Sequence, residues 1–125
     1  MRELQLQVRR IYILLGEVLD LSQQMAQTAD RGDEISLQIL MDMREEPLQK
    51  LKATRTALES RCRELRTMEG GVHLVEVLRG ASPRTPEEEP LAQLIAQTGQ
   101  LLQRTLDTDR RVSQKVTGAQ SYYHQ

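Results

Sequence analysis

Residues 14–40 read LLGEVLDLSQQMAQTADRGDEISLQIL, and this stretch decides the fold. Apolar residues on both sides of its Asp30-Arg31-Gly32-Asp33 segment recur at gaps of three and four, which is the spacing of amphipathic helices. Gly32 suits the left-handed residue that follows a helix end, and Asp33 is a favourable N-cap for the next helix. Because a connection this short makes two helices antiparallel neighbours, the stretch predicts a helical hairpin.

The same periodicity extends the hairpin over residues 3–68, with one helix at 3–30 and the other at 34–68. The first helix carries an apolar stripe formed by Leu4, Val8, Ile11, Leu15, Val18, Met25 and Ala29. The stripe of the second helix consists of Leu37, Leu40, Leu48, Leu51, Leu58, Cys62 and Leu65. Pro47 lies inside the second helix, where a proline removes one backbone hydrogen bond and clashes with the preceding turn. The sequence leaves two outcomes open, a kink near residues 43–47 or a break with Pro47 opening a new helix.

Glycines and prolines divide the remaining chain into a short helix at 72–79, a loop at 80–90 and a C-terminal helix at 90–117. The segment Thr85-Pro86-Glu87-Glu88 in the loop has the form of a helix-starting capping box. Gly118 is expected to end the last helix, and the tail beyond it to fray unless Tyr122 and Tyr123 pack back. The apolar stripe of this helix consists of Leu91, Leu94, Ile95, Leu101, Leu102, Leu106, Val112 and Val116.

The composition agrees with a helical architecture. The chain has 125 residues, no Phe, no Trp, three Tyr and a formal net charge of −1. Its core must therefore consist of aliphatic side chains between helices, and we predict a single all-α domain, residues 1–125, an antiparallel helical bundle of three long helices plus one short helical segment. No apolar run approaches the ~18 residues that a membrane span needs. The lone Cys62 builds no disulfide framework, so we expect a cytoplasmic location.

Residues that carry chemistry are sparse. The two histidines, His73 and His124, form no Glu-x-x-His pair and no zinc-binding spacing, and the serines lie in no nucleophile motif. There is also no phosphate-binding glycine loop. We therefore expect no enzyme activity, no catalytic residues, no metal, no cofactor and no small-molecule substrate. The basic residues within 50–66 scatter around the helix and the pI is about 6.1, which argues against nucleic acid as a partner.

Some apolar side chains remain on faces that a two-helix hairpin does not bury. At roughly 100° per residue, Leu6 and Ile13 fall opposite the first stripe, and Ile35, Ile39 and Met43 fall away from the second. Either the remaining helices cover these five residues as ordinary core, or the five form a protein-binding groove for a helix of another chain. The last helix carries polar residues on its inner face, and a weakly docked helix is easily displaced, so we hypothesise that it partly covers a partner site. These polar residues are Thr98, Thr105, Asp109 and Ser113.

Residues 19–52, LDLSQQMAQTADRGDEISLQILMDMREEPLQKLK, resemble the flagellar type III export chaperones of the FliT type and, more loosely, those of the FlgN type. The similar positions are Leu21-Ser22-Gln23-Gln24-Met25, Ala26, Ala29, Gly32-Asp33, Arg44, Leu48 and Leu51. The segment LLQRTLD at 101–107 also looks like the final helix of those families.

The resemblance implies a non-enzymatic cytoplasmic chaperone. Such a protein binds the C-terminal segment of an export substrate, for example the filament-cap or hook-junction protein, and holds it before secretion. The resemblance also implies a movable C-terminal helix. The alternative interpretation of the spare apolar faces is a self-associating helical scaffold, a homo-oligomer without a client.

Overall fold

Four α-helices and one short 3₁₀ turn make up the fold in the computed structural model, which describes the backbone of residues 1–124 and the side chains of residues 1–116. The helices are α1 (Arg2–Asp30), α2 (Glu34–Leu65), α3 (Gly71–Leu78) and α4 (Glu89–His124), and the 3₁₀ turn η1 spans Pro86–Glu88. Residues 1–124 contain no strand, so the predicted all-α fold class is confirmed.

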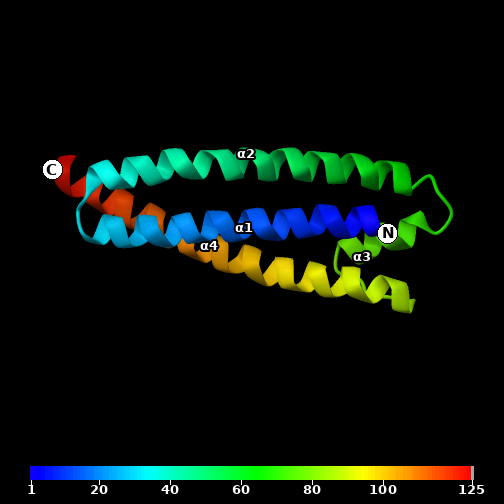
Figure 1. The fold of residues 1–125 in the computed structure, drawn as a ribbon. Helices are drawn as coiled ribbons and strands as arrows, with labels where there is room; N and C mark the ends of the chain where they lie inside the picture. The colour runs from blue at the N-terminus through cyan, green and yellow to red at the C-terminus, as the bar shows by residue number, and fades with distance from the viewer. Residues whose placement is uncertain (125) are drawn as a thin grey trace.

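α1 lies between α2 and α4 (Figure 1), packing along both, whereas α2 and α4 make little backbone contact with each other. α2 runs opposite to α1 after the short turn. α4 runs in the same direction as α1, because α3 and the loop return the chain to the end where α1 begins. α1 is therefore the central helix, and its predicted stripe is buried or half-buried throughout.

The turn between α1 and α2 forms as the sequence predicts. Gly32 has a φ of +71°, the left-handed conformation that glycine adopts without steric cost. The Asp33 carboxylate caps α2 by accepting hydrogen bonds from the hydroxyl (2.6 Å) and the backbone N–H (3.1 Å) of Ser36. These two hydrogen bonds hold the pKa of Asp33 below its ordinary value. The turn of the hairpin is therefore determined by residues next to one another in the sequence, Gly32 and Asp33.

α2 is continuous across Pro47, which excludes the predicted alternative of a break at that residue. Pro47 itself is buried, but most of the predicted α2 stripe is only half-buried, and Leu48 is exposed rather than part of the core. Only Pro47, Thr54 and Leu65 are buried on this helix. α2 is accordingly held to the rest of the fold by a thin apolar contact.

Several helix ends differ from the sequence-based boundaries. α2 ends at Leu65 rather than residue 68, and α3 starts and ends one residue before the predicted 72–79. The predicted 80–90 loop is shortened because η1 and the start of α4 at Glu89 occupy its second half.

α4 continues through Gly118 to His124 instead of ending at residue 117. A single glycine costs a helix only about 1 kcal/mol, which is too little to end it without other signals. The predicted packing of Tyr122 and Tyr123 lies outside the described side chains.

The main apolar core lies at the end of the molecule where α1 begins. Here α3 fills the space between α2 and α4 (Figure 1). Leu102 and Leu106 are exposed and do not belong to the inner stripe of α4, and Ser113 is also exposed rather than on the inner face. The buried cluster consists of Leu4, Val8, Leu65, Val75, Val77 and Leu91.

A polar contact joins α3 to the start of α4. The Glu88 carboxylate accepts hydrogen bonds from the backbone N–H groups of Arg84 (2.8 Å) and Thr85 (3.1 Å) and lies 3.2 Å from Nε2 of His73. Burial acts to raise the pKa of Glu88, but these hydrogen bonds and the nearby His73 together hold it below its ordinary value. The predicted capping box at Thr85 and Glu88 is confirmed.

Candidate protein-binding face

All five candidate residues are exposed to solvent. Neither α3 nor α4 covers them, although the sequence left that outcome open. The exposed fractions are 62% for Leu6, 55% for Ile13, 78% for Ile35, 55% for Ile39 and 54% for Met43. Large apolar side chains are also exposed elsewhere, Met68 and Val72 among them, so exposure indicates a binding surface only where such side chains line one face together.

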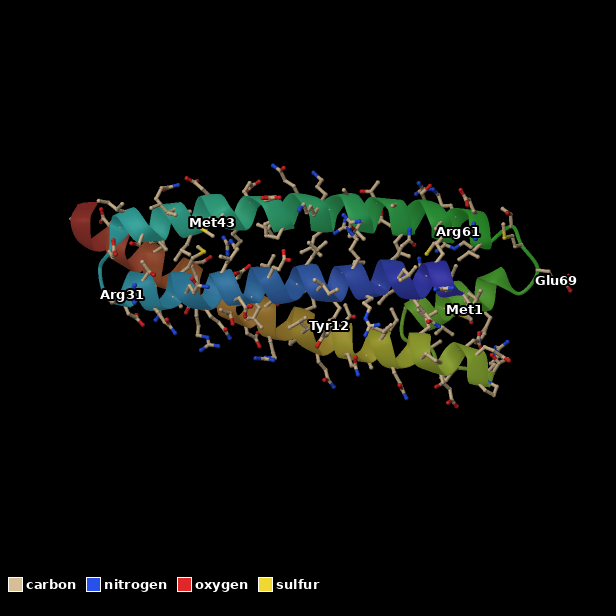
Figure 2. The ribbon with its side chains drawn as sticks, in the orientation of Figure 1. Met1, Tyr12, Arg31, Met43, Arg61 and Glu69 are labelled. Atoms are coloured by element: carbon tan, nitrogen blue, oxygen red, sulfur yellow. The ribbon has the colours of Figure 1, made fainter. Side chains whose placement is uncertain are left out.

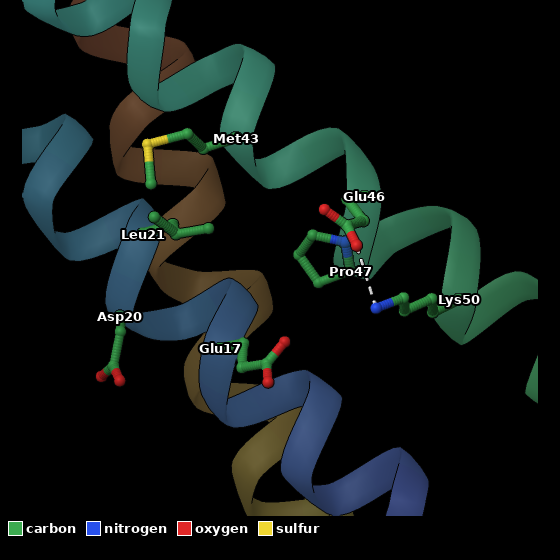
Figure 3. A pocket seen from close by; sticks show the side chains of 7 residues that line it. All are labelled: Glu17, Asp20, Leu21, Met43, Glu46, Pro47 and Lys50. Carbon is green, nitrogen blue, oxygen red and sulfur yellow. Dashed lines mark ion pairs between the residues drawn. The ribbon is translucent and has the colours of Figure 1, made fainter.

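A pocket of about 350 Å³ lies in the seam between α1 and α2 (Figure 3). Leu21 from α1 and Met43 and Pro47 from α2 form its apolar wall. Met43 projects from α2 toward α1 (Figure 2). The polar rim consists of Glu17, Asp20, Glu46 and Lys50, and Lys50 forms an ion pair of 3.0 Å with Glu46.

The five residues lie on the same side of the hairpin as this pocket. Seven residues advance a helix by roughly 700°, close to two full turns, so Leu6 and Ile13 share one face of α1. One turn after Ile13 comes Glu17, which lines the pocket. On α2, Ile35 and Ile39 precede Met43 at steps of four and lead toward the pocket.

The structure therefore brings only Met43 into the pocket itself and arranges the other four in line with it. Ile39 and Ile35 lie one and two turns beyond it toward the hairpin turn, and Leu6 and Ile13 lie on α1 toward the N-terminus. We call the surface formed by the five residues and the pocket between them the open face. It extends from Leu6 to the hairpin turn, which is about 36 Å at 1.5 Å per residue.

α4 packs on the opposite side of the hairpin. Figure 3 looks into the pocket, and α4 passes behind α1 and α2 in that view. Arg44, which is turned by roughly 100° from Met43, contacts Asp109 of α4. The hypothesis that the last helix partly covers the partner site therefore does not hold for these five residues.

The contact between α2 and α4 is a polar junction on this far side. Arg44 donates hydrogen bonds to Oδ1 of Asp109 (2.8 Å) and to Oγ of Ser22 (3.2 Å), and the Ser22 hydroxyl donates to the same carboxylate oxygen. Ser22 is buried and Arg44 is largely shielded from solvent. One side chain from each long helix meets here, so the junction fixes α4 against the hairpin.

Sequence reasoning missed the pocket and the junction for the same reason. Both depend on the register between helices, which no local pattern reveals. Two residues carry a signal: Asp109 is a charged residue within an apolar stripe, and Pro47 falls on the inner side of α2. Pro47 lines the pocket with a short ring, where a longer side chain would take up part of the space.

Within residues 1–116 no group of three or more His, Cys, Asp or Glu side chains is placed to hold a metal ion. None of the helices described is both long and apolar enough to cross a membrane. Comparison with known proteins gave no match to any family model, any curated protein or any solved structure.

Proposed function

We propose that this chain is a non-catalytic protein-binding module whose open face holds a helical segment of another protein. In line with its resemblance to flagellar export chaperones, the client is a segment of an export substrate of the filament-cap or hook-junction type, held in the cytoplasm before secretion. The observation that carries the proposal is the exposure of five large apolar side chains along one face, around a pocket with a charged rim.

The chemistry of the face favours a helical client. α1 and α2 satisfy their own backbone hydrogen bonds, so they offer no free row of N–H and C=O groups to which a β-strand could add. A seam between two helices instead accepts apolar side chains spaced i, i+3 or i+4, and i+7 along one side of a third helix. Burying apolar surface contributes about 25 cal/mol per Å², so a few such anchors give useful affinity.

The rim of the pocket adds a charge preference. Glu17 and Asp20 are exposed, and neither forms an ion pair with another described side chain, whereas Glu46 is paired with Lys50. A client helix with Lys or Arg beside its apolar anchors would complement this rim. Such charges contribute mainly to the association rate and to orientation.

The proposal is tested by calorimetric titration with peptides that correspond to the C-terminal segments of filament-cap and hook-junction proteins. Ile39→Glu should weaken binding of the cognate peptide at least about tenfold, because it places a charge in the apolar contact. The control is Val72→Glu, which also changes an exposed aliphatic residue but lies on α3, away from the open face. Both variants should keep the parental melting temperature. Absence of binding by every peptide, or equal loss in both variants, would exclude the proposed role.

A further inference from the structure

We propose that, without a client, the open face pairs with the open face of a second copy of this chain about a two-fold axis, with the two α1 helices antiparallel. The distribution of charge along the outer side of α1 carries this inference. Arg9 and Arg10 precede Ile13, and Glu17 and Asp20 follow it. All four charged side chains are exposed, and none forms an ion pair within the described residues.

A two-fold axis near Ile13 makes this pattern complementary to itself. Arg10 and Glu17 are equally far from the midpoint between Ile13 and Leu14, so an antiparallel copy places each Arg10 opposite a Glu17. A parallel arrangement would place the arginines of both copies together and the carboxylates of both copies together, which is unfavourable. A symmetric interface in which the same patch meets itself is the commonest form of homodimer.

The apolar residues fit the same axis. Leu6 and Leu21 are also equally far from that midpoint, and Leu21 forms part of the pocket wall with Met43 and Pro47. In the antiparallel pair, Leu6 of each copy enters the pocket of the other, and the two Ile13 side chains meet at the axis. The dimer would thus bury Leu6 and Ile13 of both copies, which are exposed in the single chain.

The pairing goes beyond the client-holding role because it predicts competition for one pocket. Ile35 lies nearest the hairpin turn, beyond the end of the second copy's α1, whose Arg2 falls opposite residue 25 of this chain. A client could therefore contact Ile35 first and then displace the second copy from the pocket. The dimer would keep Leu6 and Ile13 out of water until a client arrives.

The inference is tested by sedimentation velocity on the whole chain over a range of protein concentration at low salt. The parent should show a monomer–dimer equilibrium that weakens as salt screens the ion pairs. Arg10→Glu and Glu17→Arg should each weaken self-association at least about tenfold, because each places like charges opposite one another at two sites. An equimolar mixture of the two variant chains should regain dimerisation, since both pairs are then again of opposite sign. Arg104→Glu changes an exposed charge on α4 and should leave the parental equilibrium unchanged.

A parent that stays monomeric at all concentrations, or a mixture that fails to dimerise, would overturn the self-pairing. Titrating a client peptide into the Arg10→Glu chain separates the two proposals. If the Arg10→Glu chain binds the peptide while the parent forms no dimer, the client role stands and only the self-pairing is excluded. A parental dimer that binds no peptide leaves the self-pairing intact and removes only the client role.

Discussion

Replacing Gly71 with alanine should destabilise the fold by about 3 kcal/mol. A Cβ atom at this position would overlap the backbone carbonyl group of Leu65, and backbone at the end of α2 cannot move aside as a flexible side chain can. Gly71 is therefore the residue that lets α3 begin directly against the end of α2. Because α3 supplies Val75 and Val77 to the main core, a shift of this helix opens the apolar cluster as well.

Gly99→Ala is the matched control for this substitution. Gly99 lies inside α4, and a Cβ atom there would have no atom within 4 Å. Alanine should raise the free energy of unfolding by about 0.5–1 kcal/mol at such a position, because it reduces the freedom of the unfolded chain. Urea denaturation followed by circular dichroism measures both changes. Equal stability of the two variants would show that α3 does not pack closely against the end of α2.

Asp109→Ala should cost about 2 kcal/mol and loosen the C-terminal half of α4 in particular. The substitution leaves the shielded Arg44 guanidinium without its carboxylate and the buried Ser22 hydroxyl without its acceptor. Hydrogen exchange should show faster exchange of α4 amides beyond residue 100, with little change in α1. Apolar contacts compensate only in part, because Leu102 and Leu106 are exposed, although Val112 is buried.

Asp107→Ala is the control on the same helix, since Asp107 is exposed and contacts only α4 side chains. It should change stability by less than about 0.5 kcal/mol. Adding Arg44→Met to Asp109→Ala should recover part of the loss, because the unpaired charge is then gone. If the two aspartate variants behave alike, the junction does not hold α4.

The sequence predicts those features of this fold that depend on neighbouring residues. The α1 stripe, the turn at Gly32 and Asp33 and the capping box at Glu88 all follow from spacing within a few positions. The periodicity predicts Leu48, Leu102 and Leu106 for the inner stripes, but all three are exposed, because they lie at the edges of their helical faces. Whether such an edge is buried depends on where the adjacent helix lies, and the spacing of residues within one helix does not give that placement.

The candidate site was predictable to the same extent. The helical phase separated Leu6, Ile13, Ile35, Ile39 and Met43 from the inner stripes, but it left open whether α3 and α4 would cover them. The pocket required the register of α1 against α2, which places Leu21 beside Met43 across the seam. The sequence shows the charge pattern from Arg10 to Glu17. The pattern indicates a pairing surface only once the structure shows that this side of α1 is exposed to solvent.

Nuclear magnetic resonance of the isoleucine methyl groups tests the open face most directly. The chain contains five isoleucines, of which three lie on the open face and two lie elsewhere. Ile13, Ile35 and Ile39 are exposed, whereas Ile11 and Ile95 are half-buried and serve as internal controls. Every methyl signal therefore reports either on the open face or on the inside of the fold.

Adding a client peptide should shift the signals of Ile13, Ile35 and Ile39 and leave Ile11 and Ile95 in place. Raising the concentration of the protein alone should shift Ile13 most and Ile35 least, because the second copy's α1 lies over Ile13 and ends before the level of Ile35. The opposite result, in which Ile11 and Ile95 respond while the three exposed isoleucines stay unchanged, would contradict the assignment of this face as a protein-binding surface.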